Sequence, residues 1–288
     1  MIYAVMGPTC SGKTEVANFL LDKYDAEAIN FDAFQIYKGM DIGTAKISKK
    51  DPHYCKYHLL DIKSPSDSFS VMEYQVLCRK KIQELLAKNK DIVLVGGTGL
   101  YLRAVTYDYV FNVEEKIDDS KYEDLTNEQL WEMLKKLDIE ESKKIHVNNR
   151  KRLIRALNLI NSSDKNKTEL LKEQRHKLIY DNIKFIFINP DREKLYQDIN
   201  DRVNKMIKLG LVDEVKSLLD KYNLSLTASQ GIGYKEVIDY LNHKIDLKEC
   251  IGLIQKRTRN YAKRQVTFFK NQFEYKEYHS KEEAIKSL

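Results

Sequence analysis

Long apolar runs are missing from this chain of 288 residues. No stretch reaches the roughly 18 to 20 apolar residues that a membrane-spanning helix requires. The first residues form a short apolar run that leads into a glycine-rich segment, and they lack the features of a secretion signal. We therefore expect a cytoplasmic protein that does not associate with a membrane.

Cysteine is scarce, and its spacing is uninformative for metal binding. The four cysteines, at positions 10, 55, 78 and 250, are far apart and none forms a Cys-x-x-Cys pair. This spacing indicates neither a zinc site nor a disulfide framework, and reduced thiols suit the cytosol. Internal repeats and long low-complexity linkers are also missing. The length suits one large domain, or a core that carries an insert.

Positive charge is in modest excess, with a net charge of +6, but arginine is clustered. One cluster covers residues 149–155, and the other covers residues 256–264 on a long helical pattern. Clustered lysines often only solvate a helix face, whereas the planar guanidinium group of arginine suits phosphate recognition. We therefore favour RNA binding by both clusters. The candidate residues are Lys151, Arg152, Leu153, Ile154, Arg155, Arg257, Arg259, Lys263 and Arg264.

A phosphate-binding loop lies near the N-terminus. The string G-x-x-x-x-G-K-[ST] follows an apolar run at residues 2–6 and precedes a helical pattern at residues 14–23. Its members, Gly7, Pro8, Thr9, Cys10, Ser11, Gly12, Lys13 and Thr14, are all expected to bind an oligophosphate. Backbone N–H groups would face the anion, Lys13 would add a positive charge, and the Thr14 hydroxyl would ligate Mg²⁺.

The rest of the first third alternates strand and helix. Strands are predicted at 1–6, 28–31 and 91–95, and a helix at 70–88. This alternation predicts an α/β fold, with a parallel sheet flanked by helices. Ligands on such sheets lie beyond the C-terminal ends of the strands. The phosphate loop, Asp32 and Thr98 are therefore expected to meet in one crevice.

The middle of the chain, residues 111–181, is charged and helix-prone, which predicts a small helical insert that contacts RNA. An apolar strand at 184–188 then returns to the sheet. Further helices are expected at 191–209, 211–222, 233–242 and 246–272. The core would thus consist of residues 1–110 and 182–288.

The acidic residue that kinases and NTPases commonly place after a central strand is missing here. The apolar strand at 92–95 ends instead in Gly-Gly-Thr-Gly. An acid follows a different strand, at Asp32, and its neighbours Ala33, Phe34 and Gln35 suit the holding of a planar base. For a kinase or NTPase, a phosphate loop without that acid is an anomaly.

The order of the motifs resembles that of the tRNA dimethylallyltransferase family, which prenylates the exocyclic amine of an adenine beside the anticodon. The matching segments are residues 7–14, 32–46, 58–62, 96–101, 152–157, 231–236 and 261–265. They span nearly the whole chain. The run Asp-Ile-Gly-Thr-Ala-Lys at residues 41–46 is far more specific than the phosphate loop.

The resemblance implies a role for each candidate. The phosphate loop would bind the diphosphate of dimethylallyl diphosphate rather than ATP, and Asp32 would accept the proton of adenine N6. Thr98 would hydrogen-bond the diphosphate, while Lys13, Mg²⁺ and Arg202 would neutralise the leaving group. The target adenine must be turned out of its stack, so residues 32–35 and Thr98 would contact the tRNA anticodon stem-loop. A monomer is expected.

Three other functions remain open at this point. The same fold could prenylate free adenine nucleotides, the loop could belong to an ATP-binding kinase or NTPase, or the chain could bind RNA without catalysis. The chain also departs from the family pattern. The insert is short, residues 162–165 replace the usual Thr-Gly-Lys, and Phe268 stands where tryptophan is usual. These departures concern tRNA selectivity more than the chemistry. The lack of a C-terminal zinc finger favours a bacterial-type enzyme.

Overall fold

The computed structural model describes residues 1–109, 111, 120–161 and 177–288. The chain divides into two compact units, one made of Met1–Thr106 with Tyr180–Leu288, and the other of Tyr107–Ile179. The described residues of the expected insert, 111–181, lie almost entirely in the second unit. In the described part of the chain, no helix is long and apolar enough to cross a bilayer.

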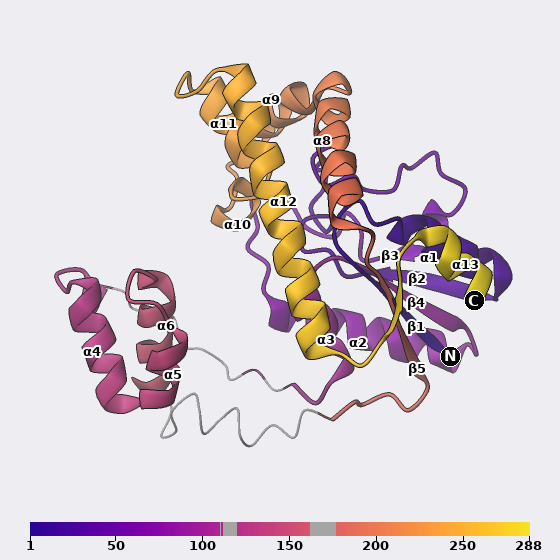
Figure 1. The fold of residues 1–288 in the computed structure, drawn as a ribbon, viewed down its shortest axis with the longest axis horizontal. Helices are drawn as coiled ribbons and strands as arrows, with labels where there is room; N and C mark the ends of the chain where they lie inside the picture. The colour runs from indigo at the N-terminus through magenta and orange to yellow at the C-terminus, as the bar shows by residue number, and fades with distance from the viewer. Residues whose placement is uncertain (110, 112–119, 162–176) are drawn as a thin grey trace. The chain divides into compact units, whose positions relative to one another are not determined.

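A six-stranded parallel sheet forms the centre of the first unit, as expected for an α/β fold (Figure 1). The strands are β1 (Ile2–Met6), β2 (Ala26–Asn30), β3 (Tyr57–His58), β4 (Asp91–Gly96), β5 (Ile183–Ile188) and β6 (Lys276–Tyr278). Their order across the sheet is β3-β2-β4-β1-β5-β6. Strand β1 pairs with β4 on one side and β5 on the other, so Ile2 lies level with Ile92 and Ile183. All five residues of β1 are buried, which explains its uninterrupted apolar sequence.

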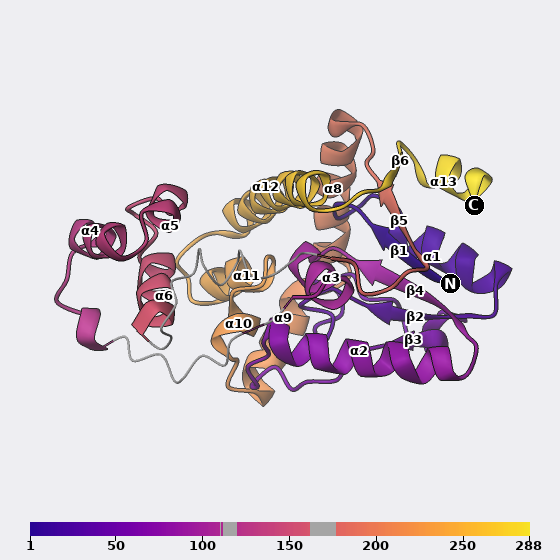
Figure 2. The same cartoon turned by 90° about the horizontal axis from the view of Figure 1, so that it is seen from below.

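Helices cover the two faces of the sheet. Tyr3 and Val5 of β1 pack into a cluster with α1 (Lys13–Lys23) and with Ala284 of α13 (Lys281–Ser287). Helix α2 (Val71–Ala87) lies along the other face, followed by α3 (Gly99–Thr106) (Figure 2). The Tyr74 hydroxyl of α2 donates to the Asn30 carbonyl at the end of β2. Side chains of successive β1 residues point to opposite faces, so one short strand anchors both helical layers.

The last third of the first unit adds a layer of helices beyond the ends of the strands. The helices are α8 (Arg192–Lys208), α9 (Leu211–Lys221), α10 (Leu226–Ser229), α11 (Tyr234–Leu241) and α12 (Leu247–Gln272). Helices α8 and α12 lie side by side (Figure 1), and Leu195, Ile199 and Ala262 form a buried cluster between them. The carboxylates of Asp191 and Asp246 cap the N-termini of α8 and α12. This layer brings residues from the last hundred positions to the phosphate loop.

The second unit is helical in its described part. It contains α4 (Asn127–Leu137), α5 (Ile139–Lys144) and α6 (Arg150–Asn161), packed around Leu130, Leu134 and Leu153. The side chain of Leu153 is fully buried, so the prediction that this side chain faces RNA is wrong: it belongs to the core. Residues 162–165, where the sequence departs from the family pattern, lie outside the described residues.

The edges of the sheet differ from expectation. Strands β3 and β6 were not predicted, and neither was helix α13. Strand β3 has two residues and β6 has three, and Lys276-Glu277-Tyr278 carries two charges. Edge strands of this kind have one solvated side and lack the apolar run that marks a buried strand. Strand β2 ends at Asn30, so Asp32 lies two residues beyond it, in the following turn.

Candidate active site

The phosphate loop connects the end of β1 at Met6 to the start of α1 at Lys13. Cys10 and Gly12 adopt left-handed backbone conformations, with φ of 64° and 86°. Gly7 has no room for a side chain, since an added Cβ would lie 2.4 Å from the Ile188 carbonyl oxygen of β5. These constraints shape a backbone concavity at a helix N-terminus, which is the geometry that binds oligophosphates.

Lys13 lies inside this loop and its ammonium group donates to the Pro8 carbonyl at 2.6 Å. Burial and, to a smaller extent, the nearby positive charge of Arg202 together lower the pKa of Lys13 to about 8. A bound anion would offset both effects. The Ser11 hydroxyl is buried and has no hydrogen-bond partner among the described residues. The loop thus holds both a charge and a polar group that an anion would satisfy.

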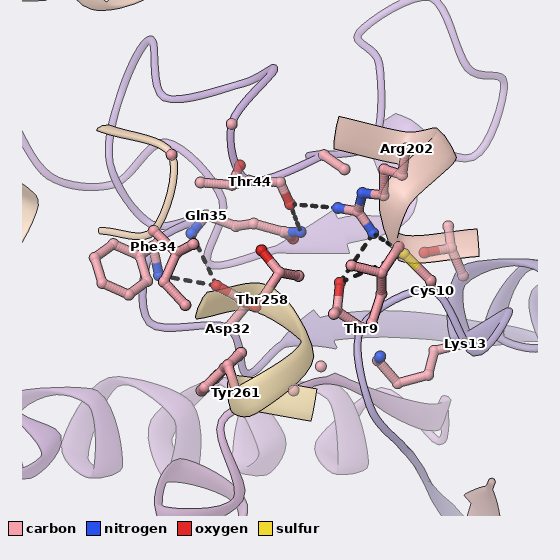
Figure 3. A pocket seen from close by; sticks show the side chains of 18 of the residues that line it. Thr9, Cys10, Lys13, Asp32, Phe34, Gln35, Thr44, Arg202, Thr258 and Tyr261 are labelled. Atoms are coloured by element: carbon pink, nitrogen blue, oxygen red, sulfur yellow. Dashed lines mark hydrogen bonds between the residues drawn. The ribbon is translucent and has the colours of Figure 1, made fainter. Parts of the chain in front are cut away.

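Arg202 reaches the loop from α8. Its Nη1 donates to the Thr9 hydroxyl at 3.0 Å and lies 3.6 Å from the Cys10 sulfur. Its Nη2 donates to the Thr44 carbonyl at 3.4 Å (Figure 3). The guanidinium group is therefore fixed beside the phosphate loop, although 188 positions separate it from Thr14 in the sequence.

Asp32 is held by the turn that follows β2. Its Oδ1 accepts from the backbone N–H groups of Phe34 at 2.9 Å and Gln35 at 3.4 Å, and its own N–H donates to Asn30 Oδ1 at 3.0 Å. In the described part of the chain, Oδ2 has no hydrogen-bond partner, and a Cβ added at Gly97 would lie 3.7 Å from it. One oxygen therefore orients the carboxylate, while the other remains available to a substrate.

A cavity of about 660 Å³ brings these groups together. Lys13, Asp32 and Arg202 all line it, together with Phe34 and Gln35. In Figure 3, Asp32, Phe34 and Gln35 lie at one side of the cavity, and Lys13 and Arg202 lie at the other. The arrangement places a carboxylate across from an anion site, with an aromatic ring and an amide beside the carboxylate.

Thr98 occupies a different position from the one its proposed role suggests. It is not among the residues that line the cavity. Its hydroxyl accepts from the Ala33 N–H at 3.0 Å and also interacts with the Tyr261 hydroxyl. Burial raises the pKa of Tyr261, which keeps this phenol protonated. In this structure Thr98 tethers the turn that carries Asp32, and its contact with a diphosphate stays a prediction.

Gln265 of α12 is a site residue whose role the sequence did not reveal. Its side-chain oxygen accepts from the Thr9 N–H at 3.0 Å, and its amide nitrogen donates to the Gly97 carbonyl at 2.9 Å. The residue is 5% exposed; its bond to Gly97 is buried and its bond to Thr9 is partly buried. Gln265 therefore joins the phosphate loop to the end of β4. In the sequence, Gln265 stands out only as a member of the segment 261–265 that matches the family pattern.

The basic residues of α12 have different surroundings. Arg257 pairs with the buried carboxylate of Glu236, and Arg259 donates to Asn200 Oδ1 at 2.5 Å. Arg264 lines the main cavity, with its guanidinium carbon 5.7 Å from the Tyr261 ring centre. Lys263 lines a second cavity of about 450 Å³. Arg257 and Arg259 thus bond to other side chains of the protein, whereas Arg264 lies at the main cavity.

The basic residues of the second unit lie on α6. Lys151, Arg152 and Arg155 are exposed, and Ile154 is partly buried. Arg150, at the start of the same helix, donates to the carbonyls of Leu125 and Tyr122 and so holds this unit together. RNA binding by the three exposed residues stays a prediction.

The residues around the loop fit a magnesium ion that arrives with its substrate. Mg²⁺ usually keeps several waters and takes one or two protein ligands together with phosphate oxygens. The Thr14 hydroxyl lines the cavity in the first turn of α1 and has no hydrogen-bond partner among the described residues. No cluster of three potential metal-binding side chains occurs in the described part of the chain. Thr14 is therefore the residue that would hold the ion beside a bound diphosphate.

Comparison with known proteins gives one consistent family. The IPP transferase family model matches residues 35–272. The chain is 43% identical over 273 residues to the tRNA dimethylallyltransferase of Anoxybacillus flavithermus, covering 94% of this chain and 88% of that protein. It is 40% identical to the tRNA dimethylallyltransferase of Bacillus subtilis, with 95% and 88% covered.

Solved structures agree with these sequence relatives. A tRNA isopentenylpyrophosphate transferase from Staphylococcus epidermidis superposes with a TM-score of 0.72 at 33% identity, covering 99% of this chain and 96% of that one. A eukaryotic dimethylallyltransferase acting on tRNA superposes with a TM-score of 0.81 at 27% identity, covering 96% and 73%. With the family model matched over most of its length, the chain belongs to the tRNA dimethylallyltransferase family.

Proposed function

We propose that this protein transfers a dimethylallyl group from dimethylallyl diphosphate to N6 of the adenine beside the anticodon of a tRNA, at position 37, and releases diphosphate. The observation that carries the proposal is the single cavity in which the carboxylate of Asp32 lies across from the phosphate loop. Family membership supports the same reaction. Cytoplasmic location, a monomeric state and magnesium dependence are parts of this proposal.

The chemistry is a displacement at the allylic carbon. A bond forms between adenine N6 and that carbon, the bond from the carbon to the ester oxygen of the first phosphate breaks so that diphosphate leaves, and one of the two N6 protons passes to Asp32. The available Oδ2 of Asp32 suits the proton transfer because Oδ1 is already occupied by two backbone N–H groups. A base positioned in this way contributes about 10² to 10⁴ in rate.

The opposite side of the cavity stabilises the leaving group. Charge grows on the diphosphate as its bond to carbon breaks, and fixed positive groups act strongly on such charge. Lys13, Arg202 and the N–H groups of the loop supply this stabilisation. When bound at Thr14, Mg²⁺ would add positive charge at the same place. Because Arg202 is already oriented by Thr9 and Thr44, little reorganisation is needed.

The acceptor side must hold an extruded purine. Stacking of a base on an aromatic side chain contributes about 1 to 3 kcal/mol, which offsets part of the cost of turning the base out. Phe34 and Gln35 line the cavity next to Asp32 and are suited to stacking and to a contact with the base edge. Arg264 at the cavity, and Lys151, Arg152 and Arg155 on α6, would bind phosphates, so RNA affinity should fall with salt.

The decisive experiment offers the purified protein dimethylallyl diphosphate, Mg²⁺ and either an anticodon stem-loop carrying adenine at position 37 or AMP. We expect prenylation of the stem-loop, detected as a mass increase of one dimethylallyl group, and little of AMP. Preferential prenylation of AMP would overturn the choice of acceptor. Turnover of ATP without a prenyl donor would support a kinase or NTPase, and stem-loop binding without transfer would support a non-catalytic RNA-binding protein.

The role of the base is tested separately with Asp32→Asn, which keeps the size of the side chain. We expect single-turnover prenyl transfer to slow by about 10² to 10⁴, with donor binding little changed. Asp220→Asn, at an exposed position at the end of α9, is the control for loss of one negative charge. A wild-type rate in Asp32→Asn would remove Asp32 as the base.

A further inference from the structure

The most specific segment of the sequence, residues 41–46, makes no direct contribution to the reaction described above, yet its backbone is unusually well held. Glu214 of α9 accepts three consecutive N–H groups of this segment. Its Oε2 accepts from Asp41 at 3.1 Å and Ile42 at 2.7 Å, and its Oε1 accepts from Gly43 at 3.2 Å. A single carboxylate thus fixes the turn from a position more than 170 residues away in the sequence.

Tyr234 fixes the carboxylate in turn. Its hydroxyl donates to Glu214 Oε1 at 2.7 Å, and the side chain is buried. Its ring also packs against Gly43, where an added Cβ would lie 2.5 Å from the ring. The other end of the segment is held by Lys46, whose buried ammonium donates to Asp41 and Asp61 at 2.7 and 2.6 Å. The segment is therefore rigid at both ends.

Between these two anchors lies the carbonyl of Thr44, which accepts from both halves of the active site. Gln35 Nε2, on the acceptor side, donates to it at 3.1 Å. Arg202 Nη2, on the diphosphate side, donates to the same oxygen at 3.4 Å (Figure 3). One backbone atom thus orients the amide that would meet the adenine and the guanidinium group that would meet the leaving group.

We propose that Glu214 is a positioning residue for prenyl transfer, which acts through the Thr44 carbonyl to align Arg202 and Gln35 with each other. Glu214 is not among the residues that line the cavity, so its effect is indirect. The inference rests on the proposed function, because it assigns Arg202 and Gln35 to the two substrates. It also gives a physical role to the segments 41–46 and 231–236, which the reaction itself leaves unexplained.

The test uses Glu214→Gln in the full-length protein, with Asp220→Asn as a control on the same helix. The amide can no longer accept all three N–H groups, because its NH₂ would face one of them. We expect kcat for prenylation of the stem-loop to fall by about 10- to 100-fold, since small misplacements of catalytic groups have effects of this size. Donor affinity without RNA should change by less than about threefold, because uniform binding is retained.

A second measurement separates positioning from stability. If Glu214 acts through Arg202, its effect should shrink by about threefold or more when Arg202→Ala is already present, because coupled residues are non-additive. Equal effects of Glu214→Gln in both backgrounds, or a wild-type kcat in a folded Glu214→Gln variant, would overturn the proposal.

If Glu214→Gln does not fold, the variant Tyr234→Phe tests the positioning role of Glu214 instead. This change removes one hydroxyl and keeps the ring packed against Gly43, and we expect a drop in kcat of about tenfold, the value of one hydrogen bond to a charged group. Unchanged kcat in a folded Tyr234→Phe protein would overturn the inference. Failure of the wild-type protein to transfer any prenyl group would instead refute the proposed function, so the two failures are distinguishable.

Discussion

The affinity of the protein for dimethylallyl diphosphate should depend on pH through Lys13. Burial and the neighbouring Arg202 lower the pKa of Lys13 to about 8 in the ligand-free protein. A bound diphosphate favours the charged form and moves the pKa back toward or above that of an ordinary lysine, near 10.4. Proton uptake then accompanies donor binding above pH 8.

The size of the effect follows from these two values. With a pKa of about 8, roughly nine-tenths of Lys13 is charged at pH 7 and roughly one-tenth at pH 9. If only the charged form binds well, the dissociation constant is about tenfold larger at pH 9 than at pH 7. The terminal phosphate of the donor is already largely ionised above pH 7, since its last pKa is about 6. The change in the dissociation constant between pH 7 and pH 9 therefore arises from a group of the protein and not from the donor.

Titration calorimetry with dimethylallyl diphosphate and Mg²⁺ measures this directly, because no transfer occurs without RNA. Lys13→Arg is the matched control, since arginine stays charged over this range. We expect the pH dependence of donor affinity to be lost, or reduced to less than about twofold, in the variant. A wild-type affinity that is constant from pH 7 to 9, or an equal fall in both proteins, would refute the assignment to Lys13.

The same pKa shift has an opposite consequence for the ligand-free protein. Between about pH 8 and the ordinary lysine pKa, the unfolded chain binds more protons at this position than the folded one. The contribution of Lys13 to the free energy of unfolding therefore rises with pH through this window. Saturating donor should remove that rise, which denaturant titrations at several pH values would detect.

Three further changes test other parts of the structure. Gln265→Ala breaks the bonds to Thr9 and Gly97 and should lower the free energy of unfolding in urea by about 1 to 3 kcal/mol and weaken donor binding; unchanged values for both would refute its bridging role. Phe34→Ala should weaken stem-loop binding by about 1 to 3 kcal/mol in a fluorescence titration, and an equal loss of donor affinity would contradict a role confined to the base. Leu153→Ala should destabilise the second unit by about 2 to 5 kcal/mol, measured by hydrogen exchange. Arg152→Ala should leave the stability of this unit unchanged and lower the salt dependence of RNA binding by about one phosphate contact. The reverse pattern would contradict a core role for Leu153 and an RNA-binding role for Arg152.

The fold could be predicted because its central strands are apolar and the phosphate loop stands between a strand and a helix. The run at residues 2–6 and the run at 91–96 are buried on both faces, so their sequences differ clearly from helices and loops. The edges could not be predicted in the same way. Strands β3 and β6 are short and form only because longer neighbours offer free hydrogen-bonding groups.

The site residues that follow the ends of strands could be predicted from the sequence. The contacts that residues of α8, α9 and α12 make around the site could not. Asp32 and the phosphate loop meet because the ends of parallel strands share one edge. Arg202 could be named only from a family pattern, and no sequence signal indicates that it contacts Thr44. The bonds of Glu214 to residues 41–43 and of Gln265 to Thr9 join segments that are 171 to 256 positions apart. Contacts of that separation leave no periodicity in a single sequence.

The strand order also bears on how the protein is made. Strand β1 carries the phosphate loop, but it lies between β4 and β5, and the latter begins only at Ile183. The carbonyl of Ile188 that closes around Gly7 therefore reaches its place long after Gly7 has left the ribosome. Because synthesis proceeds from the N-terminus, the nascent chain must keep β1 paired on one side only until two-thirds of the polypeptide exists. A complete donor site therefore requires at least the first two-thirds of the chain, and a ribosome stalled before β5 would leave one apolar edge of β1 exposed.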